Sequence, residues 1–346
     1  MRGKLLAIGI VVLGAGMAAA GIWMRGRGRP RLPLQPGAIL LITVEEGGVA
    51  LGVLAPGAVE FTRAHGVSSE AEATLAAIVT GRMPRESGLV RAGDAIARDL
   101  PVLGELLAEA GFAGAAFSAR ASPLFQSGVW RGCVTVVEDA AEGGSDRACA
   151  RAADWLLARG TEPSFCHLHL GRPAADHEPA LASAVERLHA AGSGGRTVIV
   201  AASLADRAAP RLLLRLPPGL LRGGRDERDV SLLDVVPTLL ELFGIPIRPG
   251  LMEPFLLAPR DRAPRFFLFT RPLAPPEEGC DAVRLLAGGR TYALDPAASP
   301  PENVADPALR DELRRILRAA FGYEVEEPGG GGAPRARFAG LPSPAR

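Results

Sequence analysis

The chain has 346 residues, of which 48% are hydrophobic and 22% are charged, and its formal net charge is +1. A chain of this length and composition buries one large core and is globular rather than disordered. Its 39 basic and 38 acidic residues nearly cancel, and 5% of the residues are aromatic. It therefore offers neither the positive field nor the stacking surface of a nucleic-acid-binding protein. The four cysteines are widely spaced and leave the redox compartment undecided.

An uncharged apolar segment runs from Leu5 to Trp23, after Arg2 and Lys4. Its length is close to the ~20 residues that a helix needs to span a bilayer. Residues 1–24 are therefore predicted to be a single-pass transmembrane anchor, with a cleaved signal peptide as the alternative. The membrane is thus an expected partner. Four arginines that follow the segment favour a cytoplasmic location for the rest of the chain.

Composition divides the remaining chain into four segments. Residues 25–37 are rich in proline and are predicted to be a linker, whereas residues 328–346 are rich in glycine and proline and are predicted to be a disordered tail. Between them, the patterns described below predict an α/β domain at residues 38–260 and a smaller unit at residues 261–327.

Three apolar runs rich in β-branched or aromatic residues are predicted to be buried strands: Ala38–Val44, Ser164–Leu170 and Thr197–Ser203. Helical patterns alternate with these strands, at residues 100–112, 146–160 and 179–192. This alternation predicts an α/β protein in which helices flank a layered sheet.

Residues 261–327 are predicted to form a small C-terminal α+β subdomain. Residues 265–270 and 282–294 contain short strand patterns, and Gly288 and Gly289 are predicted to form the turn of a hairpin. A capped helical pattern follows at residues 307–320.

Residues 68–84 read SSEAEATLAAIVTGRMP and predict another helix. Ser69 and Glu72 have the spacing of a capping box, which would make Ser69 the N-cap. A helix N-terminus is a ready anion site. Here Glu70 and Glu72 occupy the first turn, where they would stabilise the helix dipole and repel a sulfate or phosphate.

Five segments, in this order along the chain, resemble the sulfatases of the alkaline phosphatase superfamily. They are ILLITV (39–44), TGRMPRESGL (80–89), LPVLGELLAEAGF (100–112), SLLDVVPTLLELFGIP (231–246) and YALDPAASPPENVADP (292–307). The resemblance covers most of residues 38–320. It implies the layered α/β fold of that family, a calcium or other divalent ion, and hydrolysis of sulfate or phosphate esters. By analogy with exported sulfatases, the domain is expected on the extracytoplasmic side, although the four arginines after Trp23 argue for the opposite orientation.

At the positions of the family's nucleophile motif, this chain carries residues that cannot perform that chemistry. Counting back from Gly81 places the nucleophile, a cysteine or serine in the family, at Ala71. The same count places a serine of the motif at Thr74 and its arginine at Leu75. Because alanine has no nucleophilic group, no catalytic residue is predicted.

The family's metal-binding positions are also altered. Glu45 and Glu46 stand where the resemblance implies aspartates after the first strand, and Leu204 and Ala205 stand where it implies an Asp-His or Asp-Asn pair. His169 matches a histidine at the end of the middle strand. A hard divalent ion takes about six oxygen ligands. Glu45 and Glu46 are candidate ligands, but they supply too few, so no metal or other cofactor is predicted.

The other histidines give no clear metal site. His167 and His169 share one strand face and could form a His-x-His pair, but no third ligand is evident. His177 is predicted to lie in a surface loop, and His189 in a helix.

Two functions are compatible with these patterns. The first is an inactive, membrane-anchored sulfatase-like protein with a binding or scaffold role. The alternative is a hydrolase of sulfuric or phosphoric esters whose catalytic groups have moved, using Glu45, Glu46, His169 and a water. That alternative would require calcium or another divalent metal.

Overall fold

The computed structural model describes residues 34, 37–45, 48–68, 70–120, 124–139, 143–171, 177–204, 210–221, 223–251 and 256–257, together with five strands between residues 267 and 338. The predicted anchor and the predicted helix at 307–320 lie outside these residues. Among the residues that the structure describes, no helix is both long enough and apolar enough to cross a membrane.

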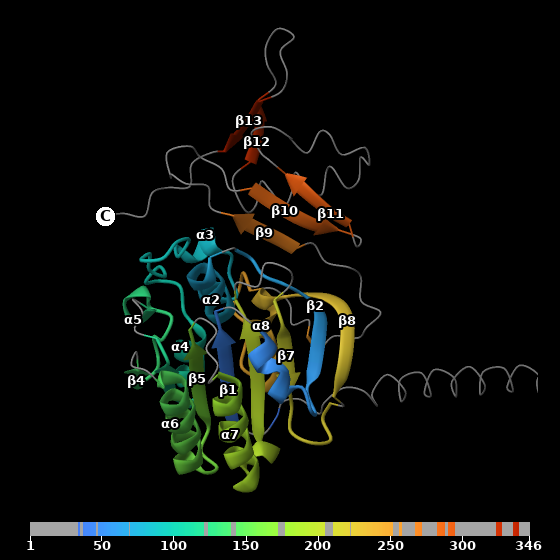
Figure 1. Ribbon diagram of the computed structural model, residues 1–346. Helices are drawn as coiled ribbons and strands as arrows, with labels where there is room; N and C mark the ends of the chain where they lie inside the picture. The colour runs from blue at the N-terminus through green and yellow to red at the C-terminus, as the bar shows by residue number, and fades with distance from the viewer. Residues whose placement is uncertain are drawn as a thin grey trace, which may run out of the picture.

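An eight-stranded mixed sheet forms the centre of the fold, with the strand order β4-β3-β5-β1-β6-β7-β2-β8 (Figure 1). Its strands are β1 (Ala38–Val44), β2 (Val59–His65), β3 (Ala113–Ser118), β4 (Thr135–Glu138), β5 (Ser164–Leu170), β6 (Thr197–Ser203), β7 (Leu212–Arg215) and β8 (Gly224–Ser231). Strands β1, β5 and β6 have the bounds that the sequence predicted. They pair in parallel, whereas β7 is antiparallel to both of its neighbours. The predicted α/β class is therefore confirmed.

Helices cover both faces of the sheet. They are α2 (Ala71–Thr80), α3 (Pro84–Ser87), α4 (Leu103–Glu109), α5 (Leu124–Ser127), α6 (Gly144–Arg159), α7 (His177–Ala190) and α8 (Val235–Leu242), with 3-10 turns η1 (Gly48–Leu54), η2 (Ser193–Gly195) and η3 (Leu232–Asp234). Alternate residues of β1 point to opposite faces. Ile39 and Leu41 pack with α2, α4 and α8, and Leu40 and Ile42 pack with η1, α6 and α7.

The C-terminal part contains two smaller sheets. Strands β9 (Phe267–Arg271), β10 (Ala282–Ala287) and β11 (Arg290–Leu294) form one, and β12 (Tyr323–Glu326) pairs with β13 (Arg335–Phe338) to form the other. Ala287 lies opposite Arg290, which confirms the predicted hairpin. The segment predicted to be a disordered tail contains β13, which pairs with β12.

The capping-box prediction for α2 is wrong, because the helix begins at Ala71 with Glu70 as its N-cap. The Ser68 hydroxyl accepts a hydrogen bond from Glu70 N–H (3.1 Å), and the Thr74 hydroxyl donates to the Ser68 carbonyl (3.1 Å). Ser68 therefore organises the turn that precedes the helix. Ser69 lies outside the described residues. The helix ends at Thr80, and the C-cap Gly81 has a φ of 66°, which favours glycine.

Candidate functional site

The carboxyl ends of β1, β5 and β6 meet at one edge of the sheet, where Val44 lies opposite both Leu170 and Ser203. Ligand sites of open α/β sheets form at this edge. Glu45 N–H donates to the Leu170 carbonyl (3.1 Å), and Leu204 N–H donates to the Val44 carbonyl (2.9 Å). The fold thus brings together Glu45 and Leu204, which follow two different strands and stand where the resemblance implies metal ligands.

Helix α2 contributes the positions of the family's nucleophile motif. Thr74 and Leu75 are fully buried, and Leu75 belongs to the same hydrophobic cluster as Leu204. Ala71 packs against that cluster. The positions that the resemblance assigns to an arginine and a metal ligand are therefore part of the apolar core, and the nucleophile position packs against it. Glu46 and Ala205 lie outside the described residues.

Glu45 forms an ion pair with Arg120, a residue that sequence analysis missed. The Glu45 side chain is 6% exposed and that of Arg120 is 38% exposed. Arg120 follows β3, whose sequence AGAAFS is rich in glycine and alanine. Because those residues are poor strand formers, the pattern did not predict the strand or the position of the arginine at its end.

His167 and His169 point to the same face of β5, as predicted, and both contact the hydroxyl of Thr43 on β1. The Thr43 Oγ1 atom lies 3.0 Å from His167 Nε2 and 2.9 Å from His169 Nδ1. On the far side, the Trp130 indole N–H donates to His167 Nδ1 (3.2 Å). These four side chains form one buried hydrogen-bonded chain that ends next to Glu45, where His169 Nε2 lies 3.7 Å from Oε1.

The two histidines of this hydrogen-bonded group, His167 and His169, are neutral at neutral pH. Burial, with a smaller contribution from His169, lowers the pKa of His167 to about 3. Burial and the positive charge of Arg120 lower the pKa of His169 to about 4, although the carboxylates of Glu72 and Glu138 act in the opposite direction. Burial also raises the pKa of Glu138. Within the described residues, no three His, Cys, Asp or Glu side chains are grouped so that they could hold a metal ion.

The prediction that His177 lies in a surface loop is wrong. It is the first residue of α7 and is 4% exposed, and this helix packs against α6 and η1. His189 lies in the last turn of the same helix, as predicted.

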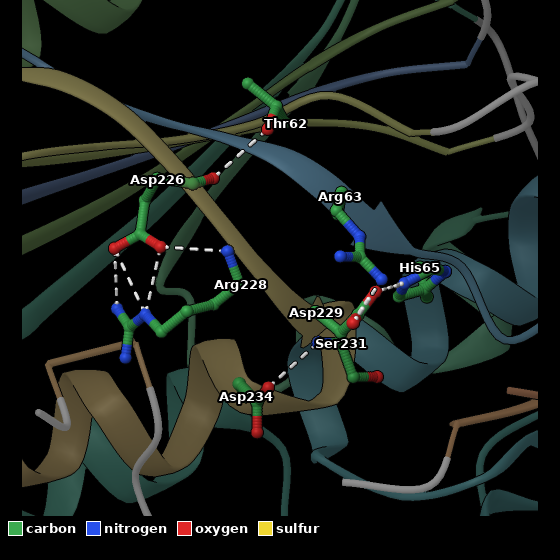
Figure 2. Close-up of polar contacts among 8 residues, drawn as sticks. All are labelled: Thr62, Arg63, His65, Asp226, Arg228, Asp229, Ser231 and Asp234. Atoms are coloured by element: carbon green, nitrogen blue, oxygen red, sulfur yellow. Dashed lines mark hydrogen bonds and ion pairs between the residues drawn. The ribbon is translucent and has the colours of Figure 1, made fainter. Parts of the chain in front are cut away.

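A second polar cluster joins β2 to the edge strand β8 (Figure 2). Asp229 accepts from His65 Nε2 (2.8 Å) and Arg63 (2.5 Å), and Asp226 pairs with Arg228 (2.9 Å). The contacts of Asp229 tie the edge strand to its neighbour, whereas the Asp226–Arg228 pair lies within β8. Their evident role is structural.

The fold is similar to that of solved sulfatases and phosphonate monoester hydrolases, as the sequence resemblance implied. Similar solved structures include the phosphonate monoester hydrolase of Agrobacterium radiobacter, with 15% identity over 88% of this chain and 100% of that one and a TM-score of 0.59. The phosphonate monoester hydrolase SpPMH from Silicibacter pomeroyi has 16% identity over 82% of this chain and 94% of its own, with a TM-score of 0.59. A putative sulfatase from Bacteroides thetaiotaomicron has 12% identity over 82% and 92%, with a TM-score of 0.57. No family model and no curated protein matches the sequence.

Proposed function

We propose that this protein is a membrane-anchored sulfatase-like protein that does not hydrolyse esters and that has a binding or scaffold role. The main support is the shared hydrophobic cluster of Leu75 and Leu204, with Ala71 packed against it. A hydrolase needs a nucleophile with a base or metal within reach. Ala71, Leu75 and Leu204, which stand where the resemblance implies the nucleophile, its arginine and a metal ligand, carry only apolar side chains.

The pairing of Glu45 also argues against a metal-dependent reaction. Its carboxylate is engaged by the Arg120 guanidinium, so a divalent ion at this position would have to displace a cation and would still lack most of its oxygen ligands. With no metal to lower the pKa of a water or to polarise an ester oxygen, metal-assisted hydrolysis is not available. With alanine at position 71, covalent catalysis is not available either.

The test combines metal analysis with an activity assay. Purified protein is incubated with calcium, magnesium, manganese or zinc, desalted and analysed for metal, and its hydrolysis of aryl sulfates and aryl phosphates is measured. We expect no stoichiometric metal and rates equal to those in buffer. Ala71→Cys and Ala71→Ser should not restore activity, because the new group would have neither base nor metal. One tightly bound ion per chain, together with turnover, would refute the proposal.

The alternative of a hydrolase with relocated groups has one observation in its favour. The buried Nε2 atom of His169 has no hydrogen-bond partner, and it faces Glu45 across 3.7 Å. Such a pair could position a water. Turnover that Glu45→Ala abolishes would support this alternative.

Membrane anchoring has its own test. If residues 5–23 span a bilayer uncleaved, the full-length protein should stay in the membrane pellet after alkaline carbonate washing and should keep an N-terminal tag. We propose that the domain faces the extracytoplasmic side. Mature soluble protein that begins near Gly21 would instead identify a cleaved signal peptide.

A further inference from the structure

The parallel strands of the large sheet begin at one edge, which we call the amino edge (Figure 1). Ala38, the first residue of β1, lies opposite Ser164 of β5 and Thr197 of β6 at this edge. The chain enters the fold here, because Leu34 N–H donates to the carbonyl of Leu242, the last residue of α8 (2.6 Å).

The entry point is close in sequence to the predicted membrane anchor. Ten residues separate Trp23, the end of the apolar segment, from Leu34. Fully extended, they span at most about 40 Å. The amino edge is therefore the side of the domain that the predicted anchor holds closest to a bilayer.

Two arginines at the amino edge form no ion pair with any described residue. They are Arg196, which directly precedes β6, and Arg215, which ends the antiparallel strand β7 opposite Ile199. Burial lowers the pKa of Arg215, and no described carboxylate acts against this effect. Burial and the positive charge of Arg215 also lower the pKa of His189, at the end of α7. The other arginines near this edge are paired: Arg159 with Glu162, Arg225 with Glu60 and Arg248 with Glu109.

Two exposed apolar side chains lie at the same edge. Val134, which precedes β4, is 92% exposed, and Ile247, which follows α8, is 38% exposed. The next residue, Arg248, pairs with Glu109 at the end of α4, which places Ile247 near the start of β3. Among the described residues, the only other large hydrophobic side chain that is exposed is Phe125.

We propose that the amino edge docks on a bilayer that contains anionic lipids. The guanidinium groups of Arg196 and Arg215 would contact lipid phosphates, and Ile247 would lie among the headgroups. Each basic residue near an anionic leaflet strengthens such attachment about fivefold. The inference rests on the proposed membrane anchoring and specifies which side of the domain contacts the bilayer.

The opposite edge of the sheet has the wrong charge for this contact. Glu72 and Glu138 act on His169 as negative charges, and the positive charge of Arg120 is already engaged by Glu45. An anionic bilayer would attract the amino edge and repel the carboxyl edge. The candidate site would therefore face the aqueous phase, where a soluble partner could reach it.

The experiment measures which edge of the full-length protein lies near the lipid, with one copy per nanodisc. Discs of phosphatidylcholine are compared with discs that contain about 30% phosphatidylglycerol. A fluorophore is attached at Ala191→Cys, an exposed position near Arg196, or at Phe125→Cys, whose backbone N–H bonds to Glu138 at the carboxyl edge. Both variants carry Cys280→Ser. Nitroxides on the lipid headgroups then quench a fluorophore that lies close to the surface.

In anionic discs at low salt, the label at position 191 should be quenched at least about threefold more strongly than the label at position 125. The difference should shrink in neutral discs, which lack the negative surface potential. It should also shrink in about 1 M salt, which screens the attraction.

Charge substitutions test the two arginines directly. Arg196→Gln/Arg215→Gln should lower the ratio of docked to undocked protein about tenfold, whereas Arg196→Lys/Arg215→Lys should keep it within about twofold, because a bilayer attracts either cation. The matched control is Arg85→Gln/Arg151→Gln, which removes the same charge from α3 and the middle of α6. It should leave the quenching unchanged. Thermal unfolding verifies that each variant is folded.

Three results would overturn the inference: equal quenching of the two labels, quenching at position 191 that does not depend on lipid charge, or equal effects of the two glutamine variants. Shielding of position 191 that requires two copies per disc would instead assign the edge to a dimer. These results are distinct from a failure of the proposed function. Full-length protein that is not retained in the discs would refute the anchoring itself, and with it this orientation.

Discussion

Arg120 and Glu45 form an ion pair in which the carboxylate is buried and the guanidinium is partly exposed. The two residues follow different strands, β3 and β1, and meet at the carboxyl edge of the sheet. Because Glu45 is 4% exposed overall, the arginine offsets the cost of a negative charge that has little contact with water.

Arg120→Gln should therefore lower the free energy of unfolding by about 1–3 kcal/mol, less than for a fully buried pair because solvent screens the arginine. Urea denaturation measures the loss. The double variant Arg120→Gln/Glu45→Gln should recover part of it. The matched control is Arg159→Gln, which breaks an exposed pair with Glu162 and should cost less than about 0.5 kcal/mol. Equal losses at both sites would contradict the buried-charge argument.

Stability should fall in mild acid because of His167 and His169. Their pKa values in the folded state are about 3 and about 4, below the ordinary value of 6.5. Below pH 6.5 the unfolded chain binds protons that the native chain does not, so the free energy of unfolding falls as the pH falls. The loss stops at about pH 4 for His169 and about pH 3 for His167.

Each histidine should contribute up to about 1.4 kcal/mol per pH unit in this window. Urea titrations at pH 7.5, 6.0 and 5.0 measure the slope. His169→Gln should reduce it by about one proton equivalent, whereas His189→Gln, at an exposed ring, should change it much less. An unchanged slope in His169→Gln would contradict the pKa assignment.

Glu70 and Glu72 should act on stability and not on chemistry. They stand at the N-cap and in the first turn of α2, where the helix dipole favours negative charge. Replacing both by glutamine should cost on the order of 1 kcal/mol. Glu186→Gln, in an exposed position in the middle of α7, serves as the control and should have little effect. A loss of several kcal/mol would point instead to a buried charge network that includes Glu72.

Cys133 and Cys166 should resist alkylation in the native protein. Burial raises the pKa of Cys133 to about 12 and that of Cys166 well above its ordinary value, and the thiolate is the reactive form. At pH 8, mass spectrometry should find maleimide on these two residues after denaturation and not before. Neither residue would then add background labelling to an assay that modifies Cys280 in order to determine on which side of the membrane the domain lies. Native labelling of Cys133 at the rate of a free thiol would refute this.

The sequence by itself determined the fold class and the central strands. Strands β1, β5 and β6 are seven-residue apolar runs buried on both faces, and this composition marks a central parallel strand whatever surrounds it. The other five strands of the large sheet were not predicted. For β3 and β8 the reason is that their residues, AGAAFS and GRDERDVS, have little strand propensity. Their pairing with β5 and β2 overrides that local preference.

The sequence also located Glu45, His169, Ala71, Leu75 and Leu204, because each is a fixed number of residues from a recognisable segment. Only the tertiary structure decided their partners. Trp130 and His167 are separated by 37 positions and Thr43 and His169 by 126, and no local pattern encodes such a pairing. Thr43 and His169 meet because the parallel strands β1 and β5 pair in register at this edge of the sheet, where burial then sets the charge of each group.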